Sequence, residues 1–176
     1  MNSDQRRSCV FGVLLVVVAV GIYANSIHNP FVFDDLRSIV DNQDIKRLWP
    51  PTWAPNDEAH HPPVNSRPLV SLSLALNYAV GGLSVTGYHL FNLGIHLLSS
   101  VVLFATLLWL FSWQDRLRPS VVGAEWVAMG SALLWMVHPL HTQNINYVFQ
   151  RSELLVGLFY LLTVCFSVRR FQTGAA

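Results

Sequence analysis

Charged side chains are scarce in this sequence: 21 of its 176 residues are Lys, Arg, Asp or Glu. That fraction, 12%, is about half of the roughly 25% found in soluble domains. A water-soluble surface is normally about a quarter to a third charged, so the composition argues against an ordinary soluble enzyme. The mean hydropathy of +0.40 argues against a disordered chain. The net charge of +1 provides no surface for binding a polyanion.

The sequence also has little cysteine and no repeated units. The two cysteines, Cys9 and Cys165, lie in or beside apolar segments, and neither has a CxxC partner. They are therefore interpreted as small apolar packing residues, without a disulfide framework. No internal repeat and no tetratricopeptide pattern is found in the sequence, which argues against a repeat architecture.

The missing charge is concentrated in four stretches, residues 8–33, 68–114, 126–150 and 154–168. A helix needs about 20 apolar residues to cross a bilayer core of about 30 Å. The first three stretches are long enough, and the fourth reaches that length only when it starts near Tyr147. The sequence therefore predicts an all-α integral membrane protein with about four transmembrane helices.

We expect a single membrane domain, residues 1–176, with a long and a short outer loop. The predicted transmembrane helices are 9–25, 88–113, 122–138 and 151–168, and the outer loops are 26–87 and 139–150. Arginine pairs flank these helices at residues 6–7, 116–118 and 169–170. Because positive residues mark cytoplasmic loops, both termini are predicted to be cytoplasmic. A cleaved signal peptide ending near residues 24–26 is the alternative for the first helix.

The long outer loop is predicted to carry short interfacial helices. The apolar run 69–80 would be roughly 18 Å long as a helix, too short to span, and it should lie at the interface or re-enter. The stretch 50–63 contains five prolines and is predicted to be an exposed, extended loop. All seven histidines lie in the outer segments or in the outer half of the second predicted transmembrane helix. The polar and reactive side chains should therefore gather on one side of the membrane.

Adjacent carboxylates, Asp34 and Asp35, follow the first predicted transmembrane helix by about ten residues. Two such groups can bind a cation or provide a general base, and helix N-capping is the alternative. Adjacent residues do not face each other on a helix, so at most one of them should point at a substrate.

Four further residues at the outer side are candidates for binding a ligand. Arg67 has a planar guanidinium suited to a phosphate, with interfacial snorkelling as the alternative. Arg151 lies near membrane depth, where ionisable residues are functional candidates or helix-end anchors. The i,i+3 pair His138 and His141 could ligate a metal, although His138-Pro139 also fits a cap and turn.

Several motifs occur together in order. They are Tyr23-Ala24-Asn25-Ser26, Phe31-Val32-Phe33-Asp34-Asp35, Arg67-Pro68-Leu69, Asn77-Tyr78-Ala79, Gly87-Tyr88-His89-Leu90-Phe91-Asn92 with His96, His138-Pro139-Leu140-His141-Thr142-Gln143, and Gln150-Arg151-Ser152-Glu153-Leu154-Leu155. In this combination the sequence resembles the transmembrane, tetratricopeptide-repeat-containing protein O-mannosyltransferases and their bacterial relatives. These belong to the GT-C class of glycosyltransferases, which use a polyprenyl-phosphate sugar as donor. The chain would therefore form part of a GT-C fold.

The resemblance implies a transfer of a hexose, mannose-like, from a polyprenyl phosphate to a hydroxyl acceptor such as a protein Ser or Thr. Asp34 or Asp35 would then be the general base. Arg67, His138, His141 and Arg151 would line the donor-phosphate side. No cofactor or metal is implied, and a divalent cation stays open. Gln143 and Gln150, where many relatives have Glu and Gly, suggest the bacterial branch and hence the bacterial inner membrane, with the active face outside. In a eukaryote the equivalent would be the ER membrane with its luminal face.

The chain departs from the family in having few predicted transmembrane helices and no repeats. We therefore expect an N-terminal module of an enzyme, incomplete or inactive by itself. The alternative is a non-catalytic small membrane protein that binds a lipid head group or a partner subunit. A third hypothesis is a metal-binding protein, which would use His60, His61, His138 and His141.

Overall fold

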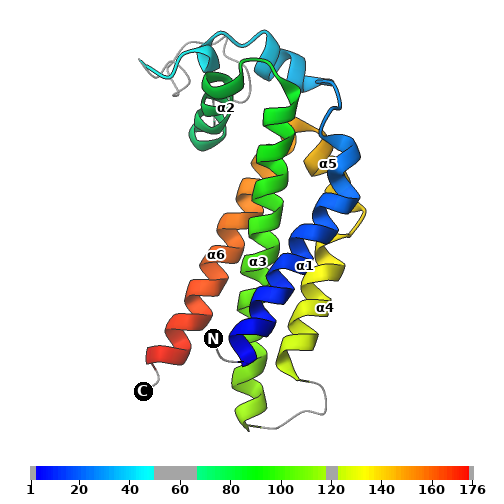
Figure 1. Ribbon diagram of the computed structural model, residues 1–176. Coiled ribbons are helices and arrows are strands. Elements are labelled where there is room, and N and C mark those ends of the chain that lie inside the picture. The colour runs from blue at the N-terminus through cyan, green and yellow to red at the C-terminus, as the bar shows by residue number, and fades with distance from the viewer. Residues whose placement is uncertain (1–2, 50–66, 118–122, 175–176) are drawn as a thin grey trace.

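The computed structural model describes residues 3–49, 67–117 and 123–174, and this part of the chain forms helices and turns without a strand. Four helices stand side by side: α1 (Ser3–Tyr23), α3 (Val85–Leu117), α4 (Ala124–Met136) and α6 (Arg151–Gly174). The two termini lie at the same end of this bundle, and α2 (Pro68–Gly81) and α5 (Leu140–Asn146) lie at the other (Figure 1).

Three helical segments of the described chain are long and apolar enough to cross a membrane, and they are Cys9–Ser26, Val85–Phe111 and Val148–Gly174. This result confirms the predicted all-α membrane class. Within the third predicted helix, 122–138, the structure has α4, which contains 13 residues and is about 20 Å long. The helix ends just before His138-Pro139, where the proline cannot continue a regular helix. The chain then starts α5 instead of extending α4.

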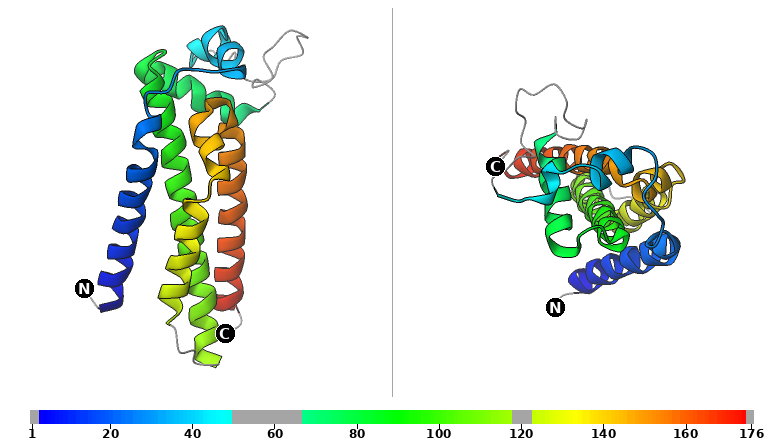
Figure 2. Two further views of the ribbon diagram at one scale, coloured as in Figure 1. Left: turned by 90° about the vertical axis from the view of Figure 1, so that its right-hand side faces the viewer. Right: turned by 90° about the horizontal axis from the view of Figure 1, so that it is seen from above.

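Helix α3 is the centre of the bundle and packs along both α4 and α6 (Figure 2). On one side, Leu15 and Ala19 of α1 join Ala128 and Ala132 of α4 in a core with no solvent exposure. Ala128 and Ala132 are four residues apart and share one face of α4. Small residues on this face let the helix backbones approach closely. A second apolar cluster joins α3 to α6 through Val102, Leu158 and neighbouring residues.

Helix α2 begins and ends as its sequence predicts. Pro68 stands at its first turn, where a missing N–H is tolerated. Gly82 follows the helix with a φ of 59° and donates its N–H to the Tyr78 carbonyl at 2.7 Å. Glycine adopts this conformation at little cost. With 14 residues, α2 is too short to span a bilayer.

A third apolar cluster fixes residues 27–49, which belong to the predicted long outer loop (the outer segment), onto the helices. Its fully buried members include Ile39 and Ile45 of the outer segment, Leu74 of α2, Tyr88 of α3, and Val148 before α6. Each such side chain contributes about 1.5–3 kcal/mol relative to an exposed position. The short helical turns Leu36–Val40 and Asp44–Lys46 are therefore packed against α2 and α3, and they give the residues around them a firm support.

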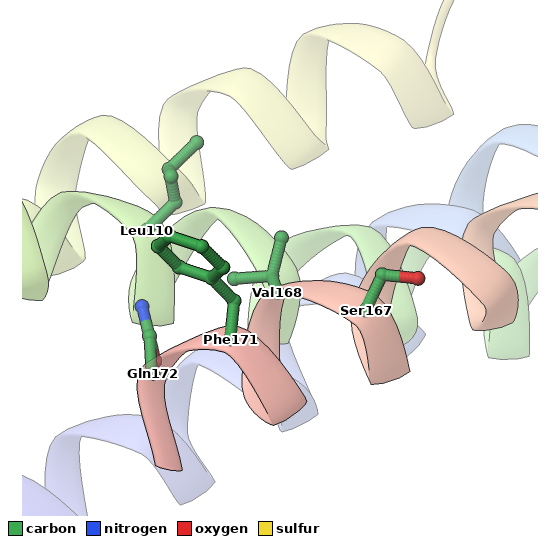
Figure 3. A pocket seen from close by; sticks show the side chains of 5 residues that line it. All are labelled: Leu110, Ser167, Val168, Phe171 and Gln172. Atoms are coloured by element: carbon green, nitrogen blue, oxygen red, sulfur yellow. The ribbon is translucent and has the colours of Figure 1, made fainter. Parts of the chain in front are cut away.

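An open hollow of about 420 Å³ lies between α3 and α6 near the end that carries the termini (Figure 3). It is lined by Leu110, Ser167, Val168, Phe171 and Gln172. The side chains around it are mainly apolar, and it lies far along both helices from Asp34, Arg67 and Arg151. It is therefore separate from the candidate site.

Candidate functional site

The acidic pair lies in a turn with an unusual backbone. Phe33, directly before it, has a φ of 49°, in the left-handed region that costs a non-glycine residue about 1–2 kcal/mol. The turn is held by the Asp35 N–H, which donates to the Val32 carbonyl at 3.0 Å. It is also held by the Val32 N–H, which donates to Asp35 Oδ2 at 3.2 Å. Backbone strain of this kind persists where the surroundings over-determine it.

Asp35 is completely buried, and its carboxylate is used by the backbone. Besides the bond from Val32, its Oδ1 accepts the N–H of Phe149 at 2.7 Å. Burial raises the pKa of Asp35, while the N–H groups of Val32, Phe149 and Val148 and the charge of His89 act in the opposite direction. Asp35 therefore ties the outer segment to the turn before α6 and presents no free face to a substrate.

Asp34 has the opposite environment. It is exposed, and its Oδ2 accepts a hydrogen bond from the Tyr147 hydroxyl at 2.8 Å. The same hydroxyl oxygen accepts the backbone N–H of Asp34 at 3.1 Å. Burial and the bond to Asp34 raise the pKa of Tyr147 to about 12. Tyr147 is therefore a neutral donor at physiological pH, and Asp34 is the accessible carboxylate of the pair.

Asp35→Asn is expected to lower the free energy of unfolding by about 1–3 kcal/mol. An amide offers one acceptor oxygen where two backbone N–H groups converge, so one N–H would face an NH₂ group. Chemical or thermal unfolding in detergent measures the loss. Asp41→Asn, a change of the same kind at an exposed site, is the control. Equal stability of the two variants would contradict the structural assignment of Asp35.

Arg67 stands at the start of α2 and is exposed. Its Nη1 donates to the Ser152 hydroxyl at 2.7 Å, and its guanidinium lies over the Phe149 ring, 5.8 Å from the centroid. The side chain is thus held on two sides while its charge stays open to solvent. A fixed and accessible guanidinium is well suited to bind a phosphate.

Arg151, the first residue of α6, is fully buried. It donates to Asn92 Oδ1 at 2.8 Å, to Ser73 Oγ at 3.2 Å and to the Tyr88 carbonyl at 3.2 Å. Its guanidinium also lies over the Phe91 ring at 4.5 Å. All of these partners are neutral, so the bonds join α2, α3 and α6 around a positive charge that they do not cancel.

His138 and His141 lie in a different cluster of side chains. His141 packs against Trp135 and His96, with ring centroids 4.3 Å and 4.9 Å away. Burial lowers the pKa of His141, and the charge of His138 lowers it further, so His141 is neutral at pH 7. His138 is exposed, and its Nδ1 accepts the Leu140 N–H at 3.3 Å. This bond fits the cap-and-turn interpretation of His138-Pro139.

His96 and Asn92 make the interhelical hydrogen bonds expected of polar residues inside a membrane bundle. His96 Nε2 bonds to the Met136 carbonyl at the end of α4, at 3.0 Å. Asn92 Nδ2 donates to the Asn144 carbonyl of α5 at 3.3 Å. The His96 Nδ1 atom is buried without a hydrogen-bond partner among the described residues.

The segment 147–152 brings four of the six candidate residues together. Tyr147 binds Asp34, Phe149 contacts both Asp35 and Arg67, and the segment contains Arg151 and Ser152. His141 instead contacts Trp135 and His96, and His138 lies next to His141. Tyr147 and Phe149 were not predicted as site residues, although Tyr147 precedes the Gln150–Leu155 motif closely in the sequence.

The metal hypothesis finds no support in the described part of the chain. Among residues 3–49, 67–117 and 123–174, no three His, Cys, Asp or Glu side chains form a group that could hold an ion. His60 and His61 lie outside the described residues, as do the predicted extended loop 50–63 and two further acidic residues.

Comparison with known proteins finds animal relatives along most of the chain. It is 36% identical over 157 residues to the mouse protein named protein O-mannosyl-transferase TMTC3, covering 84% of this chain and 16% of the relative. It is 32% identical over 166 residues to human TMTC4, covering 87% of this chain and 22% of the relative. It is 32% identical over 152 residues to Drosophila Tmtc1, covering 82% of this chain and 16% of the relative. All three carry the name protein O-mannosyl-transferase.

No protein-family model matches the chain, and no solved structure matches it. The chain spans roughly a sixth to a fifth of the length of the curated relatives that it matches. The similarity nonetheless covers more than four fifths of its own residues. On this evidence the chain belongs to the TMTC family of proteins named protein O-mannosyl-transferases.

Proposed function

We propose that the chain is the membrane module of a glycosyltransferase that moves a mannose-like hexose from a polyprenyl phosphate to a hydroxyl acceptor, such as a protein Ser or Thr. The observation that carries this proposal is the exposed Asp34 carboxylate, held by the same segment, residues 147–152, that holds Arg67 and contains Arg151. The names of the relatives support mannosyl transfer. The chain would supply this part of the site within the larger enzyme.

In the proposed reaction, Asp34 accepts the proton of the acceptor hydroxyl as its oxygen attacks the anomeric carbon of the sugar. The bond between that carbon and the phosphate oxygen breaks, and the polyprenyl phosphate leaves with the electron pair. A general base of this kind contributes about 10²–10⁴-fold. Cations fixed near the leaving phosphate stabilise the charge that develops on it. Asp35, buried and bonded to the backbone, would hold the turn that presents Asp34.

Four residues are proposed for the donor-phosphate side. Arg67 would contact the phosphate directly because its guanidinium is accessible. Arg151 is buried and would act from behind, through its positive charge and by fixing the three helices. His138 and His141 would line the neighbouring wall near α5. Because His141 is neutral at pH 7, it would bind an anion through an N–H hydrogen bond rather than through charge.

Arg67→Ala is expected to raise the KM for the lipid-linked donor by about tenfold or more, since a charge-assisted hydrogen bond contributes about 1.5–3 kcal/mol. The acceptor KM should change little. Steady-state kinetics with varied donor measure this effect. Arg37→Ala removes another exposed arginine of the outer side and is the control. A donor KM that rises equally in both variants would indicate a general loss of positive charge, not a contact made by Arg67.

We further propose that the termini are cytoplasmic and that the acidic pair faces outward. The arginine pairs near the two termini support this orientation. Both termini lie at one end of the helix bundle, and α2 and α5 lie at the other end. Gln143 and Gln150 favour the bacterial inner membrane as the location. Labelling of a single cysteine introduced at position 37, with a membrane-impermeant thiol reagent on intact cells, tests the orientation.

The function itself is tested by incubating membranes that contain the complete protein with a radiolabelled polyprenyl-phosphate mannose and a Ser/Thr-rich peptide. Transfer of label to the peptide, absent from membranes without the protein, is the expected result. The corresponding glucose donor, offered in parallel, tests the choice of sugar. Donor binding without transfer to any hydroxyl acceptor would overturn the proposal and favour a non-catalytic protein that binds lipid head groups.

A further inference from the structure

The Tyr147 hydroxyl makes two hydrogen bonds with a single residue. It donates to Asp34 Oδ2 at 2.8 Å and accepts the backbone N–H of Asp34 at 3.1 Å. The hydroxyl therefore uses both its O–H and one lone pair of its oxygen in hydrogen bonds with Asp34. This arrangement fixes the carboxylate relative to its own backbone, because rotating the Asp34 side chain would break the first bond while leaving the second in place.

The tyrosine is itself held from several directions. Its ring lies 6.2 Å from the Phe33 ring, in an edge-to-face arrangement, and 6.0 Å from the Phe149 ring. Its backbone N–H donates to the Gln143 carbonyl at 2.9 Å, and its carbonyl accepts the Gln150 N–H at 3.1 Å. Edge-to-face ring pairs contribute about 0.5–1.5 kcal/mol beyond their burial. Tyr147 is thus a firmly placed support for an otherwise exposed carboxylate.

We propose that Tyr147 is a positioning residue for the transfer reaction, which orients the Asp34 carboxylate toward the acceptor hydroxyl. With Oδ2 engaged by the tyrosine, Oδ1, which accepts no hydrogen bond from the described residues, is the oxygen that takes the acceptor's proton. This inference rests on the proposed function. It adds a residue from the turn between α5 and α6 to a site whose base comes from the segment after α1.

The protonation state of Tyr147 fits a positioning role. Burial, followed by the side-chain hydrogen bond to Asp34, raises its pKa to about 12. The phenol therefore stays a donor throughout the physiological range and does not compete with Asp34 as a base. Tyr147 also belongs to the segment 147–152, which contacts Arg67 and contains Arg151. This short segment therefore connects the residue that orients Asp34 with the two arginines proposed for the donor phosphate.

Tyr147→Phe keeps the ring contacts and removes only the hydroxyl. We expect kcat to fall by about 10- to 100-fold, since a misplaced catalytic group costs up to about 10²-fold, while the donor KM stays within about twofold. Tyr160→Phe removes a hydroxyl from an exposed tyrosine of α6 and should leave kcat unchanged. In an Asp34→Asn background, Tyr147→Phe should cause no further loss, because the two residues act as a unit. A wild-type kcat in Tyr147→Phe would overturn the inference.

A second measurement does not depend on activity. Tetranitromethane nitrates tyrosines through their phenolate form, and mass spectrometry of the digested protein reports each site. Since Asp34 raises the pKa of Tyr147, Asp34→Asn should speed nitration of Tyr147 by about threefold or more, as one pKa unit is a tenfold change in phenolate. Tyr160 in the same sample should be unaffected. An unchanged Tyr147 rate would show that the Asp34 carboxylate does not act on the Tyr147 hydroxyl and would overturn the inference. Absence of transfer in the wild type, with the nitration effect present, would instead overturn the proposed function and with it the role in transfer, while the contact between Tyr147 and Asp34 would stand.

Discussion

Asp34→Asn is expected to reduce kcat by about 10²–10⁴-fold with little change in the stability of the protein. The amide has the size of the carboxylate, and its oxygen still accepts the hydrogen bond from Tyr147. It cannot accept a proton from the acceptor hydroxyl at neutral pH. The reaction therefore loses its base while the turn around Phe33 keeps its hydrogen bonds. Transfer rates at saturating donor and acceptor, with an unfolding curve for the same preparation, measure both quantities.

Asp41→Asn provides the matched control, because Asp41 is an exposed carboxylate on the same outer segment. It should retain wild-type kcat. Retained kcat in Asp34→Asn, combined with loss of activity in a stable Asp35→Asn protein, would reverse the roles assigned to the two residues. The two carboxylates are distinguished by the quantity that each variant changes. Asp34→Asn should lower kcat, and Asp35→Asn should lower the free energy of unfolding.

Arg151→Met is expected to lower the free energy of unfolding by about 3 kcal/mol or more. The methionine fills much of the same space, but Asn92, Ser73 and the Tyr88 carbonyl all lose their donor. A buried acceptor left without its bond costs about 1–3 kcal/mol. Relief from burying a charge offsets part of this sum. Unfolding in detergent, followed by circular dichroism, measures the difference.

Two further variants make this experiment decisive. Arg151→Lys keeps a positive charge but cannot reproduce the three-way geometry of the guanidinium, so its stability should lie between those of Arg151→Met and the wild type. Arg170→Met changes an exposed arginine of the same helix and should leave stability unchanged. An Arg151→Met protein as stable as the Arg170→Met protein would contradict the structural role of Arg151.

The overall class of the fold could be predicted because it depends on a local property of the sequence. Long stretches without charge form helices in a bilayer, and that requirement holds wherever the helices pack. The third predicted transmembrane helix, 122–138, contains α4, which ends at Met136, close to the predicted end at His138-Pro139. Proline geometry, together with the start of α5, decides where that helix ends.

The different environments of Asp34 and Asp35 could not be predicted from the sequence. The two residues are identical neighbours, and what separates them is the N–H of Phe149 and the hydroxyl of Tyr147, which lie more than 110 positions later in the chain. The same applies to Arg151, whose partners come from α2 and α3. Positive charge near membrane depth was a sufficient signal to select the residue. The neutral character of its partners is a result of tertiary packing.

The length of α3 has a consequence for the position of the site relative to the lipid. Its 33 residues amount to about 50 Å, which exceeds a hydrocarbon core of about 30 Å by about 20 Å. Asn92 and the Tyr88 carbonyl, which hold Arg151, lie within the first two turns of this helix. Arg151 is therefore held near the Val85 end of a helix that is longer than the hydrocarbon core. Hydrophobic mismatch is relieved by tilting or by local changes in membrane thickness. Under the proposed function, the thickness of the surrounding bilayer would therefore influence how closely a lipid-borne phosphate approaches Arg67 and Asp34.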